Sequence, residues 1–349
     1  MKKLLKILLI LLLCLVLVIA GYATYVVLAF HRIEDNQSLT VNTAEGTAEA
    51  PIGEALKILS YNVGFGAYSD DYSFFMDGGT ESRCRSKEIG IANIRGSLAL
   101  AKAQEADIYL FQEVDINGTR SYHVDQFALL AEGFPKGFAS TFAMNYDNPY
   151  LFWPPTAPHG KNQAGIALFS RFTVDSALRR QLPIEESLMK LLDLDRAYSK
   201  NRIPTENGRE LIVYNLHLSA YTSDGTIATE QLKLLLADMK EEYEKGNYCV
   251  AGGDFNKDLP NDSGDTENTW AQPIPPTLIP EGLTLIPPVA SPLRSCRNAD
   301  APYDPAVSFT VTVDGFLISD NVECTESKVV DGGFRYSDHN PVYMTFILR

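Results

Sequence analysis

Hydrophobic and polar residues divide the chain into three regions with different patterns. Residues 7–30 form one uncharged apolar run, ILLILLLCLVLVIAGYATYVVLAF, which follows three lysines. Residues 33–54 are small and polar and show no periodicity, whereas short apolar runs and long amphipathic segments alternate from residue 55 onward. The pattern predicts an apolar N-terminal segment over residues 1–32, a flexible tether over 33–54 and one folded domain over 55–349.

The apolar run is long enough to cross a bilayer as a helix, since about 20 residues suffice. The alternative is a cleaved signal peptide, whose apolar core usually has only ~7–15 residues. This run continues past the small residues around Ala23, so an uncleaved transmembrane anchor is the preferred interpretation and a cleaved, secreted form is the alternative. Because Lys2, Lys3 and Lys6 precede the run, we expect a single-pass protein of the cell membrane with a cytoplasmic N-terminus and an extracytoplasmic domain.

The domain pattern is that of an α/β protein. Apolar strands are expected at LKILSYN, DIYLFQE, GIALFSR, ELIVYNLHL, NYCVAGGDFN, VDGFLIS and PVYMTFIL. Amphipathic helices are expected over residues 86–106, with Ser86 as the N-cap, and over residues 229–246, ending at Gly246. Strands that are apolar on both faces are buried on both faces, so the pattern predicts two packed sheets with helices outside them.

Two segments without periodicity are expected to be long loops. Residues 266–304 are rich in proline, and residues 146–160, YDNPYLFWPPTAPHG, are rich in aromatic side chains. Long loops in compact domains are often functional. Aromatic side chains also suit an interface between water and lipid, so the second loop favours a role near a membrane surface.

Several of the expected strands begin or end in a polar residue, which is the main chemical signal of the sequence. These residues are Asn62, Glu113, His217, Asp254, Asn256, Asp314, Asp338 and His339. One such residue alone is usually a solvated strand end or a paired core group. Together they can satisfy one another in one cleft, where the carboxylates repel unless a cation lies among them. An oxygen-rich set without cysteine suits Mg²⁺ or Mn²⁺, and histidines supply proton transfer, so the set indicates metal-assisted attack of water on a phosphorus ester.

The order of the motifs SYN, FQEV, NLHLS, GGDFN, VDGFLIS and YSDHNP resembles that of the endonuclease/exonuclease/phosphatase superfamily, which has the deoxyribonuclease I-like fold. The resemblance covers residues 57–348 and implies a four-layered α/β sandwich of two mixed β-sheets flanked by helices. One motif departs from the family pattern, because Gly315 and then Phe316 follow Asp314, where an aromatic and then an aliphatic residue are common. Asp314 still precedes an apolar strand and is retained as the equivalent residue.

The resemblance implies a metal site and a set of catalytic residues. The implied ligands of Mg²⁺ or Mn²⁺ are Asn62, Glu113 and Asp338, with Glu113 as the primary ligand. The implied catalytic residues are His217, Asp254, Asn256, Asp314 and His339. The family includes one-metal and two-metal descriptions, so the number of ions stays open.

Each catalytic residue has an implied role. Asp254 would orient or deprotonate the attacking water, while His217 and Asn256 would contact the oxygens of the scissile phosphate. Asp314 would hold the imidazole of His339, which would act as the general base or stabilise the transition state.

Charge and arginine positions bear on the substrate. The formal net charge is −14, and subtracting the three lysines of residues 1–30 leaves −17 for the rest of the chain. This balance disfavours nucleic acid, whose non-specific affinity depends on lysine and arginine, unless a local basic patch supplies it. Arg83, Arg85 and Arg202 are candidate substrate-binding residues because guanidinium groups suit anionic oxygens, although a solvated position explains each of them equally well.

Three functions are compatible with these observations. The favoured one is a membrane-anchored, metal-dependent phosphoesterase that hydrolyses a phosphodiester or phosphomonoester, either a lipid head group or a soluble compound. The alternative is an extracellular endonuclease or exonuclease acting on DNA or RNA. A third is a non-catalytic binding module, which would not need both a base histidine and its aspartate. The natural substrate, the oligomeric state and any disulfide pairing among Cys84, Cys249, Cys296 and Cys324 stay open.

Overall fold

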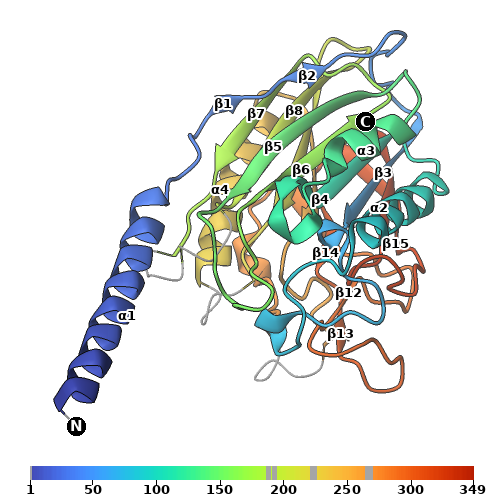
Figure 1. Cartoon of the computed structure of the whole chain (residues 1–349). Coiled ribbons are helices and arrows are strands. Elements are labelled where there is room, and N and C mark those ends of the chain that lie inside the picture. Colours follow the sequence, from blue (N-terminus) through green and yellow to red (C-terminus); the bar gives the residue numbers. More distant parts are fainter. Residues whose placement is uncertain (1, 186–189, 191–194, 221–225, 264–269) are drawn as a thin grey trace.

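Two large mixed β-sheets packed face to face form the domain in the computed structural model of the chain (Figure 1). The structure describes residues 2–185, 190, 195–220, 226–263 and 270–349. The first sheet contains, in spatial order, β1 (Gln37–Ser38), β7 (Ser176–Gln181), β8 (Ala197–Pro204), β9 (Glu210–His217), β10 (Tyr248–Asp254), β14 (Asp314–Ser319) and β11 (Leu283–Ile286). The second contains β15 (Val322–Val329), β16 (Val342–Leu348), β3 (Ala55–Asn62), β4 (Ile108–Gly118), β6 (Asn162–Ser170), β5 (Ala139–Asp147) and β2 (Val41–Asn42).

Apolar side chains fill the space between the sheets. Ile58 and Leu110 of the second sheet and Val213, Val250 and Phe316 of the first belong to one buried cluster. Within the sheets, β3 pairs with β4 and β9 with β10 in parallel, and the other pairs of strands are antiparallel. Burial on both faces explains why the central strands have apolar runs without alternation.

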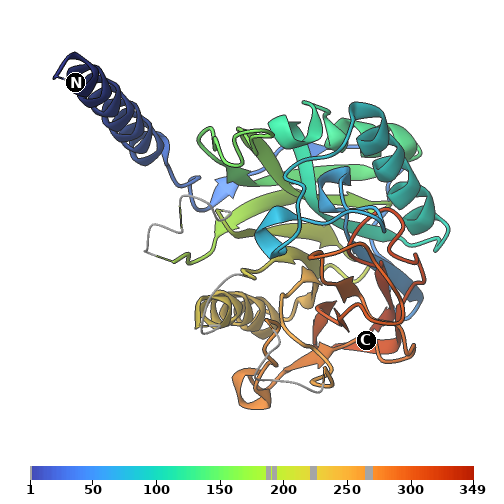
Figure 2. The ribbon, with the colours of Figure 1, turned by 60° about the horizontal axis from the view of Figure 1, so that its bottom comes forward.

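Helices cover the outer faces of both sheets (Figures 1 and 2). The described helices of the domain are α2 (Lys87–Lys102), α3 (Gln126–Gly133) and α4 (Thr226–Glu244). Residues of α2 and α3 pack with β3 and β4, and residues of α4 pack with β8, β9 and β10. Ser86 caps α2, as the sequence predicts, because its Oγ accepts a hydrogen bond from the N–H of Ile89. The predicted four-layered α/β sandwich is confirmed.

The helix α1 (Lys2–Ala29) extends away from the domain (Figure 1). Its apolar side chains are exposed, and only Val26 is buried. The helix is long and apolar enough to cross a membrane, and a signal sequence at an N-terminus would have the same properties.

The expectation that residues 33–54 form a flexible tether does not hold for residues 37–50. There β1 pairs with β7 at the edge of the first sheet, and β2 pairs with β5 at the edge of the second. Ala48 and Ala50 form further bridges to the domain. Such short pairings cover the exposed edges of both sheets, and they leave no periodic pattern in the sequence because each spans only two residues.

The expectation of a long loop over residues 266–304 is also wrong in part. The strand β11 pairs with β14 over four residues and extends the first sheet. The 3-10 helix η5 (Pro276–Leu278) precedes it, and the short strand β12 (Cys296–Arg297) pairs with β13 (Thr310–Val311) outside both sheets. Residues 266–269 lie outside the described residues.

A buried carboxylate ties α4 to the first sheet. Glu242 is fully buried and forms ion pairs with Lys200 at 2.8 Å and with Arg202 at 2.7 Å. Burial alone would raise the pKa of Glu242, but hydrogen bonds from Arg202, Lys200, Asn247 and Lys245 lower it far below its usual range. Glu242 therefore stabilises the fold in its charged form.

Replacing Glu242 by glutamine should lower the free energy of unfolding by about 3 kcal/mol at pH 7, because it breaks a buried ion pair and leaves Lys200 with Asp238 and Arg202 with Glu210 as their remaining acidic partners. The folded-state pKa is depressed, so the contribution is complete above the unfolded pKa of about 4.3 and is lost as the pH falls below it. Urea unfolding at pH 7 and at pH 3 checks this, and a difference between variant and wild type that grows on acidification contradicts it.

Candidate active site

The first sheet places three of the predicted site residues side by side. The strands β9, β10 and β14 are neighbours in the sheet. Their register sets Asp254, at the end of β10, opposite both His217 at the end of β9 and Asp314 at the start of β14. Three polar residues at strand ends therefore lie side by side at one end of the first sheet, as the sequence pattern suggests.

The second sheet contributes the other half of the site. Asn62 ends β3, and the neighbouring strand β4 carries Glu113. Asp338 and His339 lie just before β16, which pairs with β3. An isolated antiparallel β-bridge also joins His339 to Cys296 of β12. This bridge holds the turn before β16 against the segment that follows β11.

Glu113 occupies a β-bulge within β4, and the strand does not end there as the sequence suggests. The pairing with β6 shifts register between Phe111 and Val114, and β4 continues to Gly118. Glu113 itself has a φ of +56°, an uncommon conformation for a residue other than glycine. Bulges re-aim side chains next to active sites, and the surrounding sheet holds this costly conformation in place.

The side-chain amide of Asn62 connects residues of both sheets. Its Nδ2 lies 3.0 Å from Oδ2 of Asp254, 3.3 Å from Oε1 of Glu113 and 3.5 Å from Nε2 of His339. Its Oδ1 accepts a hydrogen bond from the N–H of Gly64 at 3.0 Å. A cation held through this oxygen would require the amide to turn over and release Gly64.

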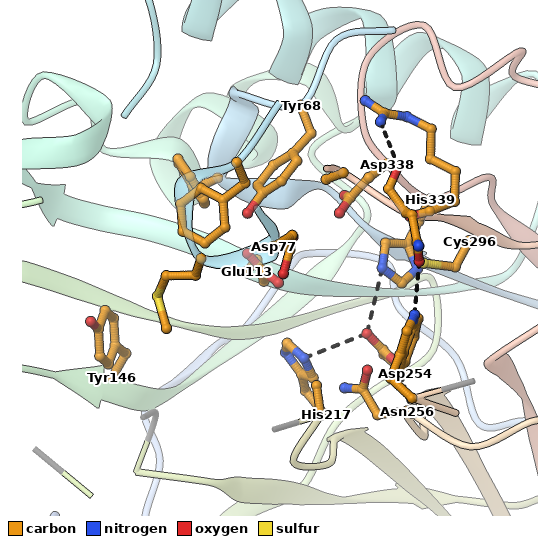
Figure 3. Close-up of a pocket in the computed structure, with 18 of the residues that line it drawn as sticks. Tyr68, Asp77, Glu113, Tyr146, His217, Asp254, Asn256, Cys296, Asp338 and His339 are labelled. Atoms are coloured by element: carbon orange, nitrogen blue, oxygen red, sulfur yellow. Dashed lines mark hydrogen bonds and ion pairs between the residues drawn. The ribbon is translucent and has the colours of Figure 1, made fainter. Parts of the chain in front are cut away.

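Asp254 lies between two imidazoles (Figure 3). Its Oδ2 is 3.5 Å from Nε2 of His217 and 3.6 Å from Nε2 of His339. On the other side of the ring, Nδ1 of His339 is 2.8 Å from Oδ2 of Asp314. A carboxylate on Nδ1 fixes the orientation of an imidazole and leaves Nε2 for proton transfer or substrate contact.

Burial and neighbouring charges set the protonation of the site. Burial alone would lower the pKa of His339, but Cys296, Asp314 and Asp254 together raise it well above its usual value. Burial lowers the pKa of His217 well below its usual value, and the nearby Arg196 adds to this. Burial raises the pKa of Asp254 in spite of the opposing effect of His339. These surroundings favour the protonated form of His339 and the neutral form of His217.

These groups lie at one side of a pocket of about 490 Å³. The predicted residues that line it are Glu113, His217, Asp254, Asn256, Asp338 and His339. Aromatic and apolar side chains form much of the remaining wall, namely Phe65, Tyr68, Phe74, Met76, Tyr146 and Trp270. The backbone N–H of Asn256 donates to Oδ1 of Asp254 at 2.9 Å, which keeps these two residues together at the pocket wall. The pocket can accept a substrate larger than the phosphate group itself.

Two arginines that the sequence did not single out also line the pocket. Arg120 is buried, pairs with Asp115 at 2.7 Å and lies over the ring of Phe65 at 4.0 Å. Arg297 is buried and donates to backbone carbonyls, including that of Ser69 at 2.9 Å. Arg120 lies in the 3-10 helix η3 (Thr119–Ser121) and Arg297 in the short strand β12, and neither segment has a periodic pattern that would mark the arginine in the sequence.

The structure does not support Arg83, Arg85 and Arg202 as substrate-binding residues. None of the three lines the pocket in the part of the chain that the structure describes. Arg85 forms ion pairs with Asp71 and Glu81 on the surface. Arg202, on β8, pairs with Glu242 and Glu210. The positive charges of Arg85 and Arg202 are therefore paired within the protein.

The carboxylates of the site fit a divalent cation. Oδ1 of Asp314 is buried and has no hydrogen-bond partner among the described residues. Burial raises the pKa of Glu113, with Arg120 opposing the rise and Asp338 adding to it. Carboxylates in such surroundings are stable only when they are protonated or when a cation compensates them.

Two sets of residues could hold such an ion. One is the set implied by the sequence, Glu113 and Asp338 with Asn62. The other comprises Asp254, Asp314 and His339, whose potential ligand atoms all lie within 4.8 Å of one another. In the second set, the hydrogen bond between Asp314 and Nδ1 of His339 already uses one oxygen of Asp314. The first set therefore leaves the histidine available for catalysis.

Known proteins share this fold. The sequence profile of the Endonuclease/Exonuclease/phosphatase family matches residues 59–339, and no match was found among curated proteins. Similar solved structures include an endonuclease/exonuclease/phosphatase from Beutenbergia cavernae, with 18% identity and a TM-score of 0.56 over 84% of this chain and 72% of that chain. A family protein from Bacteroides thetaiotaomicron has 17% identity and a TM-score of 0.56 over 85% and 96%.

A third similar structure is ANGEL2, described as a 2′,3′-cyclic phosphatase, with 15% identity and a TM-score of 0.55 over 89% of this chain and 98% of that chain. At such identities the solved structures show the fold alone. The family profile, however, spans most of the sequence and includes the motifs that supply the pocket. The chain belongs to the endonuclease/exonuclease/phosphatase family.

Proposed function

We propose that the protein is a membrane-anchored, divalent-metal-dependent phosphoesterase that hydrolyses its substrate by attack of an activated water on phosphorus. One observation carries the proposal. Asn62 of the second sheet lies within 3.5 Å of polar atoms of Glu113, Asp254 and His339, so residues distant in sequence converge on one pocket. Converging carboxylates and histidines with perturbed pKa values in a pocket are typical of hydrolytic sites.

In this proposal the metal ligands are Glu113, Asp338 and Asn62. The bound Mg²⁺ or Mn²⁺ would neutralise charge on the phosphoryl oxygens and orient the substrate. The carboxylates would then coordinate the ion, whose positive charge offsets their mutual repulsion. The remaining polar residues of the pocket then act on water and substrate.

The chain's own residues divide the remaining tasks. Asp254 lies between the imidazoles of His217 and His339, and the pKa of its carboxyl group is raised. A carboxylate with a raised pKa is suited to orient a water molecule and to accept its proton near neutral pH. His217 and Asn256 line the same wall and can donate hydrogen bonds to phosphate oxygens. His339, held by Asp314, places a positive charge where negative charge develops in the transition state.

Membrane anchoring by α1 is part of the proposal, with the domain outside the cytoplasmic membrane. The exposed apolar surface of the helix supports it. The lysines at its start favour a cytoplasmic N-terminus. A cleaved and secreted form is the alternative.

A nuclease is the second candidate, and the positions of the arginines count against it. Strong binding to nucleic acid requires basic side chains that are free to contact phosphates. Arg85 and Arg202 are paired with acids. Of the three arginines that line the pocket, Arg120, Arg196 and Arg297, the first is bound to Asp115 and the last to backbone carbonyls. A compact phosphoester is therefore the preferred substrate.

Hydrolysis of a chromogenic phosphodiester, bis-p-nitrophenyl phosphate, tests the proposal. We expect turnover with Mg²⁺ or Mn²⁺ and loss of turnover after EDTA treatment, restored by added metal. A parallel assay with plasmid DNA and a panel of phosphomonoesters identifies the substrate class. Metal-independent turnover contradicts the metal site, and no turnover of any ester favours a binding module.

A further inference from the structure

The loop between β5 and β6 exposes adjacent aromatic side chains. Tyr150, Phe152 and Trp153 are 39%, 53% and 67% exposed. Outside α1, the other exposed large apolar side chains among the described residues are scattered: Met76, Ile89, Trp270, Val289 and Val307. Single exposed apolar residues are ordinary, whereas a contiguous exposed aromatic group marks a surface that contacts a partner or a membrane.

Hydrogen bonds attach this aromatic loop to the end of α1. Tyr22 donates its hydroxyl hydrogen to the carbonyl of Tyr150 at 3.1 Å and accepts from the N–H of Phe152 at 2.9 Å. The N–H of Tyr150 donates to the hydroxyl of Tyr25 at 3.1 Å. The rings of Tyr22 and Phe152 also meet edge to face, with centroids 6.4 Å apart. The loop therefore has a fixed position along the helix.

The helix defines the depth of that position. Counted from Ile7, the first residue after the lysines, about 20 residues at about 1.5 Å each span the ~30 Å of a bilayer core and end near Val26. Tyr25 then lies at the interface on the domain side, where tyrosine is enriched in membrane proteins, and Tyr22 lies about one helical turn deeper. Because the loop is bonded to these two tyrosines, Phe152 and Trp153 lie near the boundary between the lipid head groups and the hydrocarbon core.

The same loop forms part of the pocket wall. Tyr146 and His159, at its two ends, line the pocket. The N–H of His159 donates to the carbonyl of Trp153 at 3.3 Å, and Nδ1 of His159 lies 2.9 Å from the carbonyl oxygen of Ser82. The aromatic loop therefore connects the pocket wall with the end of α1.

We propose that Tyr150, Phe152 and Trp153 insert into the head-group region of the bilayer that holds α1, and that the pocket takes a phosphoester of a membrane lipid from that surface. This inference rests on the proposed function and deepens it by naming the source of the substrate. Aromatic side chains are suited to this position because their apolar rings meet lipid while their polar atoms meet water. A lipid substrate is also compatible with the negative net charge of the domain. The membrane brings the lipid to the pocket, so binding does not require long-range attraction between the domain and an anionic substrate.

Tryptophan fluorescence tests the insertion without any assay of activity. The chain has two tryptophans, Trp153 and Trp270. The full-length Trp270→Phe variant, reconstituted in phosphatidylcholine vesicles, reports on Trp153 alone. We expect its emission to be quenched when the vesicles contain lipids brominated near the head group. Equal emission in brominated and ordinary vesicles overturns the insertion, whether the loop faces water or another protein.

A loop variant tests the source of the substrate. We expect Phe152→Ser/Trp153→Ser to lose about 10-fold or more in hydrolysis of lipid phosphodiester in its own vesicles, because the variant removes two aromatic side chains that would insert into the membrane. Hydrolysis of bis-p-nitrophenyl phosphate in water should stay unchanged, and Val289→Ser serves as the control for removing an exposed apolar residue. Equal losses on both substrates, or no loss on lipid, contradict the inference. If the wild type hydrolyses neither ester, the proposed function fails, and the quenching result still decides insertion.

Discussion

His339→Ala should lower kcat/KM for a phosphodiester by about 10³-fold, the size of effect that a proton-transferring or charge-stabilising histidine has. Nδ1 of His339 lies 2.8 Å from Asp314, which favours the charged form of the imidazole, and Nε2 lies 3.6 Å from Asp254. Its removal takes away the charge and also leaves Asp314 without its partner. The loss corresponds to about 4 kcal/mol of transition-state stabilisation. Steady-state kinetics at saturating Mg²⁺ measures it.

Two further variants separate catalysis from folding. Asp314→Asn keeps the shape of the side chain and removes its charge, so it should reproduce part of the His339→Ala loss with little change in melting temperature. His123→Asn is the matched histidine control, because His123 is exposed, contacts Asn117 and does not line the pocket. Asparagine tolerates the positive φ of 56° at this position. Equal activity of His339→Ala and wild type contradicts the assigned role.

Glu113→Gln should lower activity at fixed Mg²⁺ by about 10²-fold or more while leaving the metal-free fold at least as stable. The amide is a weaker ligand for a hard cation than the carboxylate it replaces. Without metal, however, the carboxylate is unfavourable, since burial and Asp338 both raise its pKa. The variant should therefore need more Mg²⁺ for half-maximal activity and melt at the same or a higher temperature in EDTA.

The Mg²⁺ dependence of the rate and thermal melting with and without metal check this prediction. Glu132→Gln is the control, because Glu132 is exposed on α3 and lies outside the pocket. A lower melting temperature of Glu113→Gln in EDTA would show that Glu113 supports the fold. An unchanged Mg²⁺ requirement would place the ion elsewhere, for example with Asp254, Asp314 and His339.

The sequence predicted the sandwich and the strand-end residues because both depend on short-range pattern. Polar side chains such as Asn62 and Asp254 interrupt apolar strands, and such groups need partners when buried. The sequence could not predict the bulge at Glu113, because its φ of +56° depends on the pairing of β4 with β6, which is distant in the chain. The sequence could locate the residue but not the conformation that aims it.

Loop residues and ion pairs were less predictable for the same physical reason. Arg120 and Arg297 reach the pocket from segments without periodicity, so their burial depends on the tertiary fold. The sequence suggested Arg202 as a side chain that is free to bind phosphate. In the structure it pairs with Glu242, which is 40 residues away in the chain. The pairing of residues 37–50 with both sheet edges likewise involves two-residue strands, too short to give a pattern.

The position of a bound Mn²⁺ ion in crystals of the full-length protein, found from its anomalous scattering, tests the proposed metal site most directly. We expect a peak in the pocket within coordination distance of the Glu113 carboxylate, with Asp338 and the turned-over amide of Asn62 beside it. A peak on another part of the surface, or none in the pocket under conditions in which Mn²⁺ supports hydrolysis, would contradict this expectation.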